Sequence, residues 1–390
     1  MRRHGGIIAG SVATIAVLLV AGFRATPYDN YVLLADALRH GRVWIDWPGP
    51  YIDALRYNGR YYVIEAPLPA LLLLPAVALF GTATNQSVLA ALLAGVATFA
   101  AWHIGRAFAV PAGARVVLCA FLLLGTDLFW CATFGDVWFI AHVAAVAFTL
   151  LAVLELLGAR RSWLVALFAA CAVESRFTML LAVPVYAVML GLGIGREGAL
   201  ASGRTARLRD AGGYALVLLP VAVLWVAYNE ARWGVAYDLG YTTWFHQDAA
   251  GSPTGSPFAL RYFGYQLQSF FVQAPAYTPS FPYLVPGFGG VALTWTSPAL
   301  LLALWARRPA PLALALWGAT LLCAAPSFVY YVNGFAQFGM RHALDFEPFL
   351  FVLMLMAAAR GFGPLPTALC FYSTIAGAWG VWFWRTFVRH

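Results

Sequence analysis

The sequence contains no lysine, and charged residues of either sign are scarce. All 24 basic residues are arginine, 16 residues are acidic, and charged side chains make up only 10% of the chain. Soluble domains are about a quarter charged, whereas 62% of this chain is hydrophobic. A soluble domain is therefore excluded. The net charge of +8 does not require a nucleic-acid partner, because most arginines lie in short segments between apolar runs.

Several signals of cofactor chemistry are also missing. No His/Asp/Glu spacing makes a convincing metal site, no glycine-rich phosphate loop appears, and we find no internal repeat. We therefore expect no cofactor, with a divalent metal left open, no nucleotide donor and no repeat-built transporter. Inert thiols buried in apolar stretches, without metal-ligand spacing, are what we expect of the five cysteines: Cys119, Cys131, Cys171, Cys323 and Cys370.

Long apolar runs dominate what is present. A spanning helix needs about 20 apolar residues, and these runs are too continuous for the alternating strands of a membrane barrel. The sequence predicts an all-α polytopic membrane protein with about 10–12 transmembrane helices, one transmembrane domain over residues 1–390. The N-terminal run is expected to be a retained span. Spans are expected near 6–23, 68–82, 87–105, 113–130, 137–157, 163–174, 177–194, 212–229, 292–306, 310–332, 347–359 and 364–384.

The positions of the arginines orient these spans, because cytoplasmic loops are enriched in basic residues. The arginines at 106, 115, 160, 161, 196–209, 307, 308 and 360 are expected on the cytoplasmic side. Four segments are then extracytoplasmic: 24–65, 133–136, 229–290 and 333–347. One conflict arises, because two apolar runs lie between the outer segment 24–65 and cytoplasmic Arg106, where an odd number of crossings is needed. We expect the run 68–80 to be short or re-entrant.

Ionisable groups collect at the ends of the spans on the extracytoplasmic side. Asp29 follows the first span by a handful of residues and precedes an amphipathic helix over Tyr31–Arg39, and Asp136 opens another span. Glu174 and Arg176 interrupt a long apolar region, where an ion costs roughly 2.5–3.5 kcal/mol. Arg341, His342 and Asp345 follow in a fourth segment.

The segment 231–290 is rich in aromatic residues and poor in charge. Such a composition is typical of the membrane interface or of a sugar-binding surface. We expect an interfacial helix near 258–271 within an ordered lid or a mobile loop, and Trp244 is a candidate contact for substrate.

Carboxylates and arginines at the outer face favour one kind of chemistry. Arginine can bind the phosphate of a lipid-linked sugar donor through two hydrogen bonds. An acceptor hydroxyl needs a general base within hydrogen-bond reach, and burial makes aspartate a stronger base.

Two stretches then resemble the GT-C superfamily of polyprenyl-phosphate-sugar glycosyltransferases, which includes protein O-mannosyltransferases and aminoarabinose transferases. The stretch 27–42, PYDNYVLLADALRHGR, is similar to the family's first extracytoplasmic loop, and Asp29 falls at its catalytic position. The stretch 57–69, YNGRYYVIEAPLP, resembles the entry to the second span. The family's usual paired acids and its lysine are replaced here by Asp29-Asn30 and by Glu65. These departures argue against a bridged metal and shift the phosphate contact to arginine.

The resemblance implies a transferase that moves a sugar from a polyprenyl-phosphate donor to an acceptor hydroxyl of a glycan, lipid or protein, with inversion. It implies a multi-pass protein of the cell inner (plasma) membrane, serving the cell envelope, with its active site facing the extracytoplasmic side. The residues are expected to act as follows: Asp29 and Asp136 in catalysis; Arg176 and Arg341 on the donor phosphate; Tyr28, Tyr61, Glu65, His342, Asp345 and Trp244 on the substrate.

Simpler interpretations remain open for each group. Asp29 and Asp136 are also suitable helix N-caps, and Arg341 with Asp345 can form an i,i+4 pair. Glu174 with Arg176 can be a mutual ion pair, while Asp36, Asp46 and Asp53 fit solvated turns.

A transporter or flippase of a lipid-linked or anionic substrate is the main alternative function. It would place ionisable groups near mid-membrane. A non-catalytic membrane subunit is the third.

Overall fold

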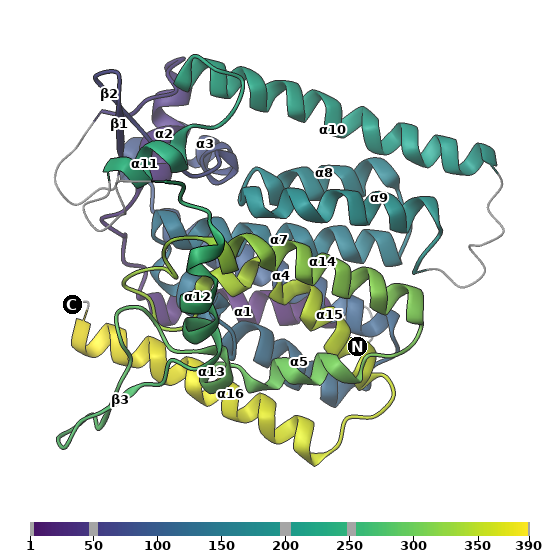
Figure 1. Ribbon diagram of the computed structural model, residues 1–390. Coiled ribbons are helices and arrows are strands. Elements are labelled where there is room, and N and C mark those ends of the chain that lie inside the picture. Colours follow the sequence, from purple (N-terminus) through teal and green to yellow (C-terminus); the bar gives the residue numbers. More distant parts are fainter. Residues whose placement is uncertain (1–3, 47–53, 196–203, 248–254, 389–390) are drawn as a thin grey trace.

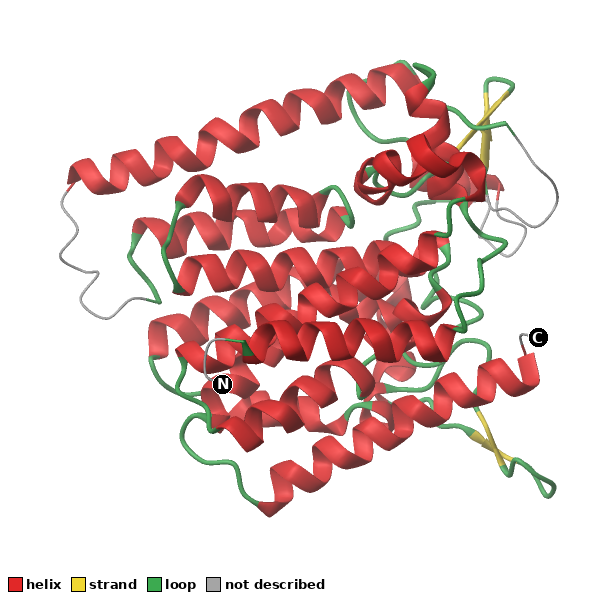
Figure 2. Ribbon diagram, turned by 180° about the vertical axis from the view of Figure 1, so that it is seen from behind, coloured by secondary structure: helices red, strands yellow, loops and turns green. Residues whose placement is uncertain are grey.

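The computed structural model describes residues 4–46, 54–195, 204–247 and 255–388. Asp53 and part of the arginine-rich segment 196–209 thus lie outside the described residues. The chain forms a bundle of roughly parallel and antiparallel helices, with short strands and small helices gathered at one end (Figures 1 and 2). We call this the first-loop end, because it contains the segment between Arg24 and Glu65.

Long apolar helices confirm the all-α polytopic membrane fold. Four described helices are long and apolar enough to cross a membrane, and a fifth span results if a pair bent by 53° counts as one. The four are α4 (Gln86–Ala107), α7 (Val137–Leu157), α10 (Arg204–Trp233) and α14 (Ala310–Val329), and the bent pair is α5 (Ala112–Leu124) with α6 (Leu128–Phe134). The remaining helices along the bundle are α1 (Gly5–Ala21), α8 (Ser162–Val173), α9 (Val183–Gly191), α15 (Glu347–Ala358) and α16 (Pro364–Phe383).

The break at Glu174 and Arg176 is confirmed. Helix α8 ends at Val173, and the chain turns back through the 3-10 helix η2 (Phe177–Ala182) into α9. The expected span 292–306 is not a continuous α-helix. It consists of α13 (Leu293–Thr296) and a 3-10 helix, η5 (Pro298–Trp305), because Pro298 has no N–H to continue the α-helical ladder.

Helices α2 (Asn30–Arg39) and α3 (Leu68–Phe80) account for the crossing conflict. Arg39 of α2 donates to the carbonyl of Val77 at 3.1 Å. The N–H of Leu68 donates to the carbonyl of Glu174 at 2.8 Å. Just beyond α3, the side chain of Asn85 donates to the carbonyl of Phe23 at the end of α1, at 2.9 Å. Helix α3 therefore starts and ends at the first-loop end, and only α4 crosses from there, as the arginine pattern requires.

The aromatic segment folds as short elements at the first-loop end. The expected interfacial helix is present as η4 (Leu260–Tyr262) followed by α12 (Phe263–Phe271). Phe270 is fully buried against Phe328 and Phe346.

The other small elements are β1 (Leu55–Tyr57), β2 (Arg60–Tyr62), η1 (Gly81–Ala83), α11 (Gly240–Gln247), β3 (Ala276–Tyr277), β4 (Leu284–Val285), η6 (Arg341–Asp345) and the short π-helix η7 (Trp384–Val388). Strands β1 and β2 pair antiparallel, as do β3 and β4.

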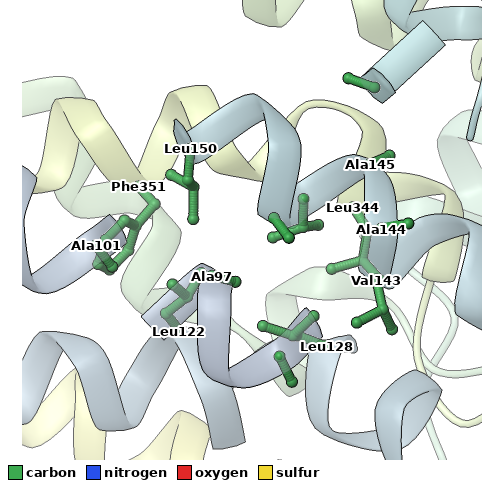
Figure 3. Packing of buried hydrophobic residues seen from close by; sticks show 14 of the residues in the cluster. Ala97, Ala101, Leu122, Leu128, Val143, Ala144, Ala145, Leu150, Leu344 and Phe351 are labelled. Carbon is green, nitrogen blue, oxygen red and sulfur yellow. The ribbon is translucent and has the colours of Figure 1, made fainter. Parts of the chain in front are cut away.

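Small residues allow the central helices to approach closely. A side-chain carbon on Gly95 of α4 would lie 2.7 Å from the carbonyl oxygen of Gly10 in α1. Without side chains at these two positions, α1 packs directly on the α4 backbone, as is typical of membrane helices. Ala97 and Ala101 of α4 and Leu150 of α7 continue this buried core (Figure 3). The core fixes the first-loop ends of α4 and α7, on which the candidate site is built.

Candidate active site at the first-loop end

Asp136 anchors the start of the first loop. Its side chain is fully buried at the N-terminus of α7 and accepts a hydrogen bond from Thr26 Oγ1 at 2.5 Å. Thr26 Oγ1 in turn accepts the N–H of Tyr28 at 3.0 Å, and the carbonyl of Tyr28 accepts the N–H of Val137 at 3.1 Å. Gln86 of α4 donates to the same carbonyl at 3.0 Å. Asp136 therefore holds the start of the first loop at the N-terminus of α7, and its predicted part in catalysis stays a prediction.

Asp29 follows this anchored segment directly and begins α2. Its backbone carbonyl accepts the N–H groups of Val32 and Leu33, at 2.8 and 3.3 Å. Its carboxylate makes no capping hydrogen bond to the helix, although Asp29 occupies the N-cap position. Partial burial raises the pKa of this carboxyl, and a hydrogen bond from its own backbone N–H offsets part of the increase. The carboxylate is therefore a stronger base than an aspartate in water.

Asp345 forms the most extensively bonded ionic contact of the site. Its buried carboxylate receives Arg176 through Nε at 3.1 Å and Nη2 at 3.0 Å, and Thr178 Oγ1 at 2.7 Å. His142 of α7 contacts Oδ1 through Nδ1 at 3.0 Å. Four bonds thus join α7, η2 and η6 at one carboxylate.

The charges of this group follow from its contacts. Burial alone would raise the pKa of Asp345, but Arg176 and His142 outweigh it and hold the pKa well below its usual range. Asp345 is therefore ionised. Burial lowers the pKa of His342 well below 6.5, and nearby Arg341 and Arg176 lower it further. His342, stacked on His142 with ring centres 5.6 Å apart, is therefore neutral at physiological pH.

Arg341 does not pair with Asp345. The segment forms the 3-10 helix η6, in which residues three apart, not four, share a face. The interpretation of an i,i+4 pair is wrong for this reason. Arg341 instead donates to the carbonyl of Phe335 at 3.1 Å, and its guanidinium carbon lies 5.4 Å from the centre of the Phe139 ring. The suggested ion pair of Glu174 with Arg176 is also not formed, since Arg176 bonds to Asp345.

Tyr31 and Tyr241 lie close enough to Arg176 to be affected by its charge, and Glu65 acts on the same two tyrosines. Burial raises the pKa of Tyr241 to about 12; the positive charge of Arg176 lowers it, and Glu65 raises it further. Tyr31 is fully buried in α2, and its pKa is raised well above 10 by burial and then by Glu65, while Arg176 lowers it. Tyr31 of the first loop and Tyr241 of α11 are therefore both near Arg176. Tyr31 lies two residues along the chain from Asp29.

Arg232, near the end of α10, is a buried arginine that was not predicted as a site residue. Its guanidinium lies 4.1 Å from the Tyr228 ring and 4.7 Å from the Trp233 ring. It donates to the carbonyl of Val63 at 3.3 Å and to Asn229 at 2.8 Å. Tyr228, Asn229, Arg232 and Trp233 have the i, i+1, i+4, i+5 spacing of one helix face, a signal that was available in the sequence. Arg232 therefore ties α10 to the strand that leads into Glu65.

Two buried acids were also missed or left without a role. Asp127, between α5 and α6, and Glu347, at the start of α15, are 5% and 1% exposed. Burial of carboxyl groups among apolar helices is costly. In the structure Asp127 is close enough to interact with both Glu347 and Arg341. No local pattern in the sequence predicts that these three residues meet.

The remaining candidates lie around this centre. Tyr28 packs on Trp138, with ring centres 4.8 Å apart. Tyr61 lies in β2, and Trp244 packs on a separate small cluster that includes Tyr62 and Trp233. Asp46 contacts Arg42 on the surface at 3.0 Å, as expected of a solvated turn. Within the described residues, no group of three or more His, Cys, Asp or Glu side chains could hold a metal ion.

This architecture is a GT-C-like fold, as the resemblance implies. It matches the crystal structure of ArnT from Cupriavidus metallidurans bound to undecaprenyl phosphate, with a TM-score of 0.54 and 15% sequence identity. The match covers 93% of this chain and 61% of that chain, so this chain spans less than two thirds of the length of its structural relative. No protein-family model and no curated protein matches the sequence.

Proposed function

We propose that this protein is a membrane glycosyltransferase that moves a sugar from a polyprenyl-phosphate donor to an acceptor hydroxyl. The observation that carries the proposal is the setting of Asp29: it follows the segment that Asp136 and Thr26 hold, and it lies two residues before Tyr31, whose pKa the charge of Arg176 lowers. The fold adds support, because ArnT, which shares it, was crystallised with undecaprenyl phosphate. The site would face the extracytoplasmic side of the inner membrane, where the arginine pattern puts the first-loop end.

In this proposal Asp29 is the general base. Its carboxylate takes the proton of the acceptor hydroxyl as the oxygen attacks the anomeric carbon of the donor sugar. The bond from that carbon to the phosphate oxygen breaks, and the configuration inverts. Its raised pKa supports this role, and so does the absence of a capping bond from its carboxylate to α2. General-base catalysis typically contributes 10²–10⁴-fold to the rate.

Arg176 and Arg341 are proposed to stabilise the departing phosphate. Asp345 occupies Nε and Nη2 of Arg176 and so orients the guanidinium, which leaves Nη1 for a phosphate oxygen. The side chain of Arg176 is 14% exposed and so is not fully enclosed. A hydrogen-bond donor that is already oriented stabilises the developing phosphate charge more than a flexible donor does, because the oriented group need not reorganise during the reaction.

The sugar and the acceptor would contact the polar residues around these two centres. Tyr61 lies within β2, and Glu65 follows Val63, which Arg232 contacts just beyond that strand. Tyr28 adjoins Asp29. Carboxylates and aromatic rings are the usual partners of sugar hydroxyls and sugar faces. His342 and Trp244 are proposed as further contacts, on η6 and α11.

The test uses the purified protein in lipid nanodiscs with undecaprenyl-phosphate-linked hexoses and pentoses and with membrane extract as acceptor. Release of undecaprenyl phosphate in a single turnover is measured together with binding of undecaprenyl phosphate. Asp29→Asn should lower the single-turnover rate by about 10²–10⁴-fold with binding unchanged, whereas Arg176→Ala should weaken binding as well. Arg176→Lys, which keeps the charge opposite Asp345, serves as the variant that retains the fold.

The pH dependence gives a second measurement. Because Asp29 must be ionised to act and its pKa is raised, activity should fall on acidification at a pH above its ordinary value of 3.8. The residual activity of Asp29→Asn should lack this acidic limb. A folded Asp29→Asn protein with full activity would refute the assignment of the base.

A further inference from the structure

A cavity of about 470 Å³ lies at the end of the bundle opposite the first-loop end. This volume is within the roughly 300–1,000 Å³ of ligand pockets. It is formed where η5, α15 and α16 meet, and its main lining residues are Leu302, Trp305, Arg307, Met354, Arg360 and Leu365.

The cavity is separate from the candidate active site. Helix α15 starts at Glu347, beside Asp345, and ends at Ala358, which lines the cavity. Its 12 residues put about 18 Å between the two places at a rise of 1.5 Å per residue. No residue assigned above to donor, acceptor or catalysis lines this cavity.

The rim of the cavity is cationic and the wall is apolar. Arg307 and Arg360 both line the cavity and are exposed, and neither guanidinium has a hydrogen bond or an ion pair with any residue in the described parts of the chain. Between residues 298 and 370 the only acids are Asp345 and Glu347, and both lie at the other end of α15. Nothing in this stretch neutralises the two arginines locally.

The apolar wall continues onto the outer surface of the bundle. Trp305 and Leu365 line the cavity and are 56% and 64% exposed. In a membrane protein, a tryptophan and arginines at the end of apolar helices mark the headgroup level of the bilayer. The cavity therefore opens at the depth where a lipid headgroup meets its acyl chains.

We propose that this cavity binds one anionic glycerophospholipid of the cytoplasmic leaflet. Its phosphate would lie between Arg307 and Arg360, and an acyl chain would lie along Leu302, Met354 and Leu365. Basic pockets between membrane helices on this side of a bilayer suit anionic headgroups, and guanidinium binds phosphate oxygens through strong charge-assisted hydrogen bonds. A zwitterionic lipid is disfavoured, because this stretch offers no carboxylate for its ammonium group.

The experiment measures retention of dioleoylphosphatidylglycerol by the delipidated full chain, using native mass spectrometry, with dioleoylphosphatidylcholine as the comparison lipid. The wild-type protein should retain one phosphatidylglycerol in preference to phosphatidylcholine. R307Q/R360Q should bind it about thirtyfold more weakly, the effect of losing two cationic contacts. Arg308→Gln is the matched control: Arg308 is exposed and adjacent, but it does not line the cavity, so its variant should stay within about twofold of wild type.

A second variant tests the apolar part. Met354→Trp adds volume inside the cavity and should weaken phosphatidylglycerol retention without changing the charge. Thermal unfolding in phosphatidylcholine reports whether each variant is folded. Equal retention of the two lipids, or equal loss in R307Q/R360Q and Arg308→Gln, would overturn the proposal. A third arm uses undecaprenyl phosphate: if R307Q/R360Q lost this lipid but kept phosphatidylglycerol, the site would belong to the donor lipid and the proposal would be wrong.

Discussion

The carboxylate of Asp345 should be one of the least replaceable groups for stability. It is fully buried and accepts two bonds from Arg176, one from Thr178 and one from His142. Asp345→Leu would leave the guanidinium of Arg176 buried without a counter-charge. Removing one partner of a buried ion pair costs about 3–5 kcal/mol, which is a large share of a typical folding free energy of roughly 5–15 kcal/mol.

The magnitude can be separated into its parts with a small set of variants. Thr178→Val removes one hydrogen bond to a charged group and should cost about 1.5–3 kcal/mol, including the unsatisfied acceptor. The double variant R176M/D345L removes both charges and should be less destabilised than Asp345→Leu alone, because no uncompensated charge remains. The coupling energy between the two positions should be about 0.5–3 kcal/mol.

The chain provides its own probe for the assay. All five cysteines are free, and four of them are buried, so a thiol-reactive fluorescent dye in detergent would report unfolding directly. Unfolding temperatures of the variants would be compared at one detergent concentration and one pH. If Asp345→Leu unfolded at the wild-type temperature, or if the double variant were as unstable as the sum of the two single variants, the ion pair would not have the role assigned to it.

Two further predictions concern the groups beside this pair. Burial raises the pKa of Glu174 to about 7, and Arg232 offsets part of the increase. Because the folded protein holds this proton more tightly than the unfolded chain does, the stability of the fold should fall as pH rises from 4.5 through 7. Glu174→Gln should therefore raise the unfolding temperature at pH 8.5 and leave it nearly unchanged at pH 4, and an equal change at both values would contradict the assignment. Arg232→Lys should lower stability by about 1–3 kcal/mol. Lysine keeps the charge, but it cannot bond both Val63 and Asn229 while it stacks on the aromatic rings. An unchanged unfolding temperature would show that these contacts are dispensable.

Local patterns in the sequence were enough to predict much of the fold. The amphipathic pattern after Asp29 predicts α2, and the apolar runs predict the long helices. The arginine pattern also exposed the crossing conflict, which the short helix α3 resolves by returning to its own side. These features are set within one turn or one span, where periodicity and charge are informative.

Contacts across the chain could not be predicted in the same way. Asp345 lies 203 residues from His142 and 169 from Arg176, and no local pattern encodes such a meeting. The 3-10 form of η6 also removed the expected pair with Arg341, because the residues around Asp345 are shaped by its partners on other elements. The spacing of the residues around Arg232 indicates one helix face, but the expected span ends at residue 229, so Arg232 was placed in the following loop.

The contacts of the first loop bear on whether Asp29 is only a helix cap. The loop is held from Thr26 to Tyr28 by Asp136, Val137 and Gln86, all through contacts that precede Asp29. Helix α2 then begins with bonds to the backbone carbonyl of Asp29, which any residue would provide. The carboxylate adds no bond to the helix amides, yet it is held in a partly buried position where ionisation is less favourable than in water. A residue needed only to start α2 would gain nothing from such a carboxylate, so Asp29→Asn should leave stability nearly unchanged, and any large loss of activity would come from the chemistry of the missing base.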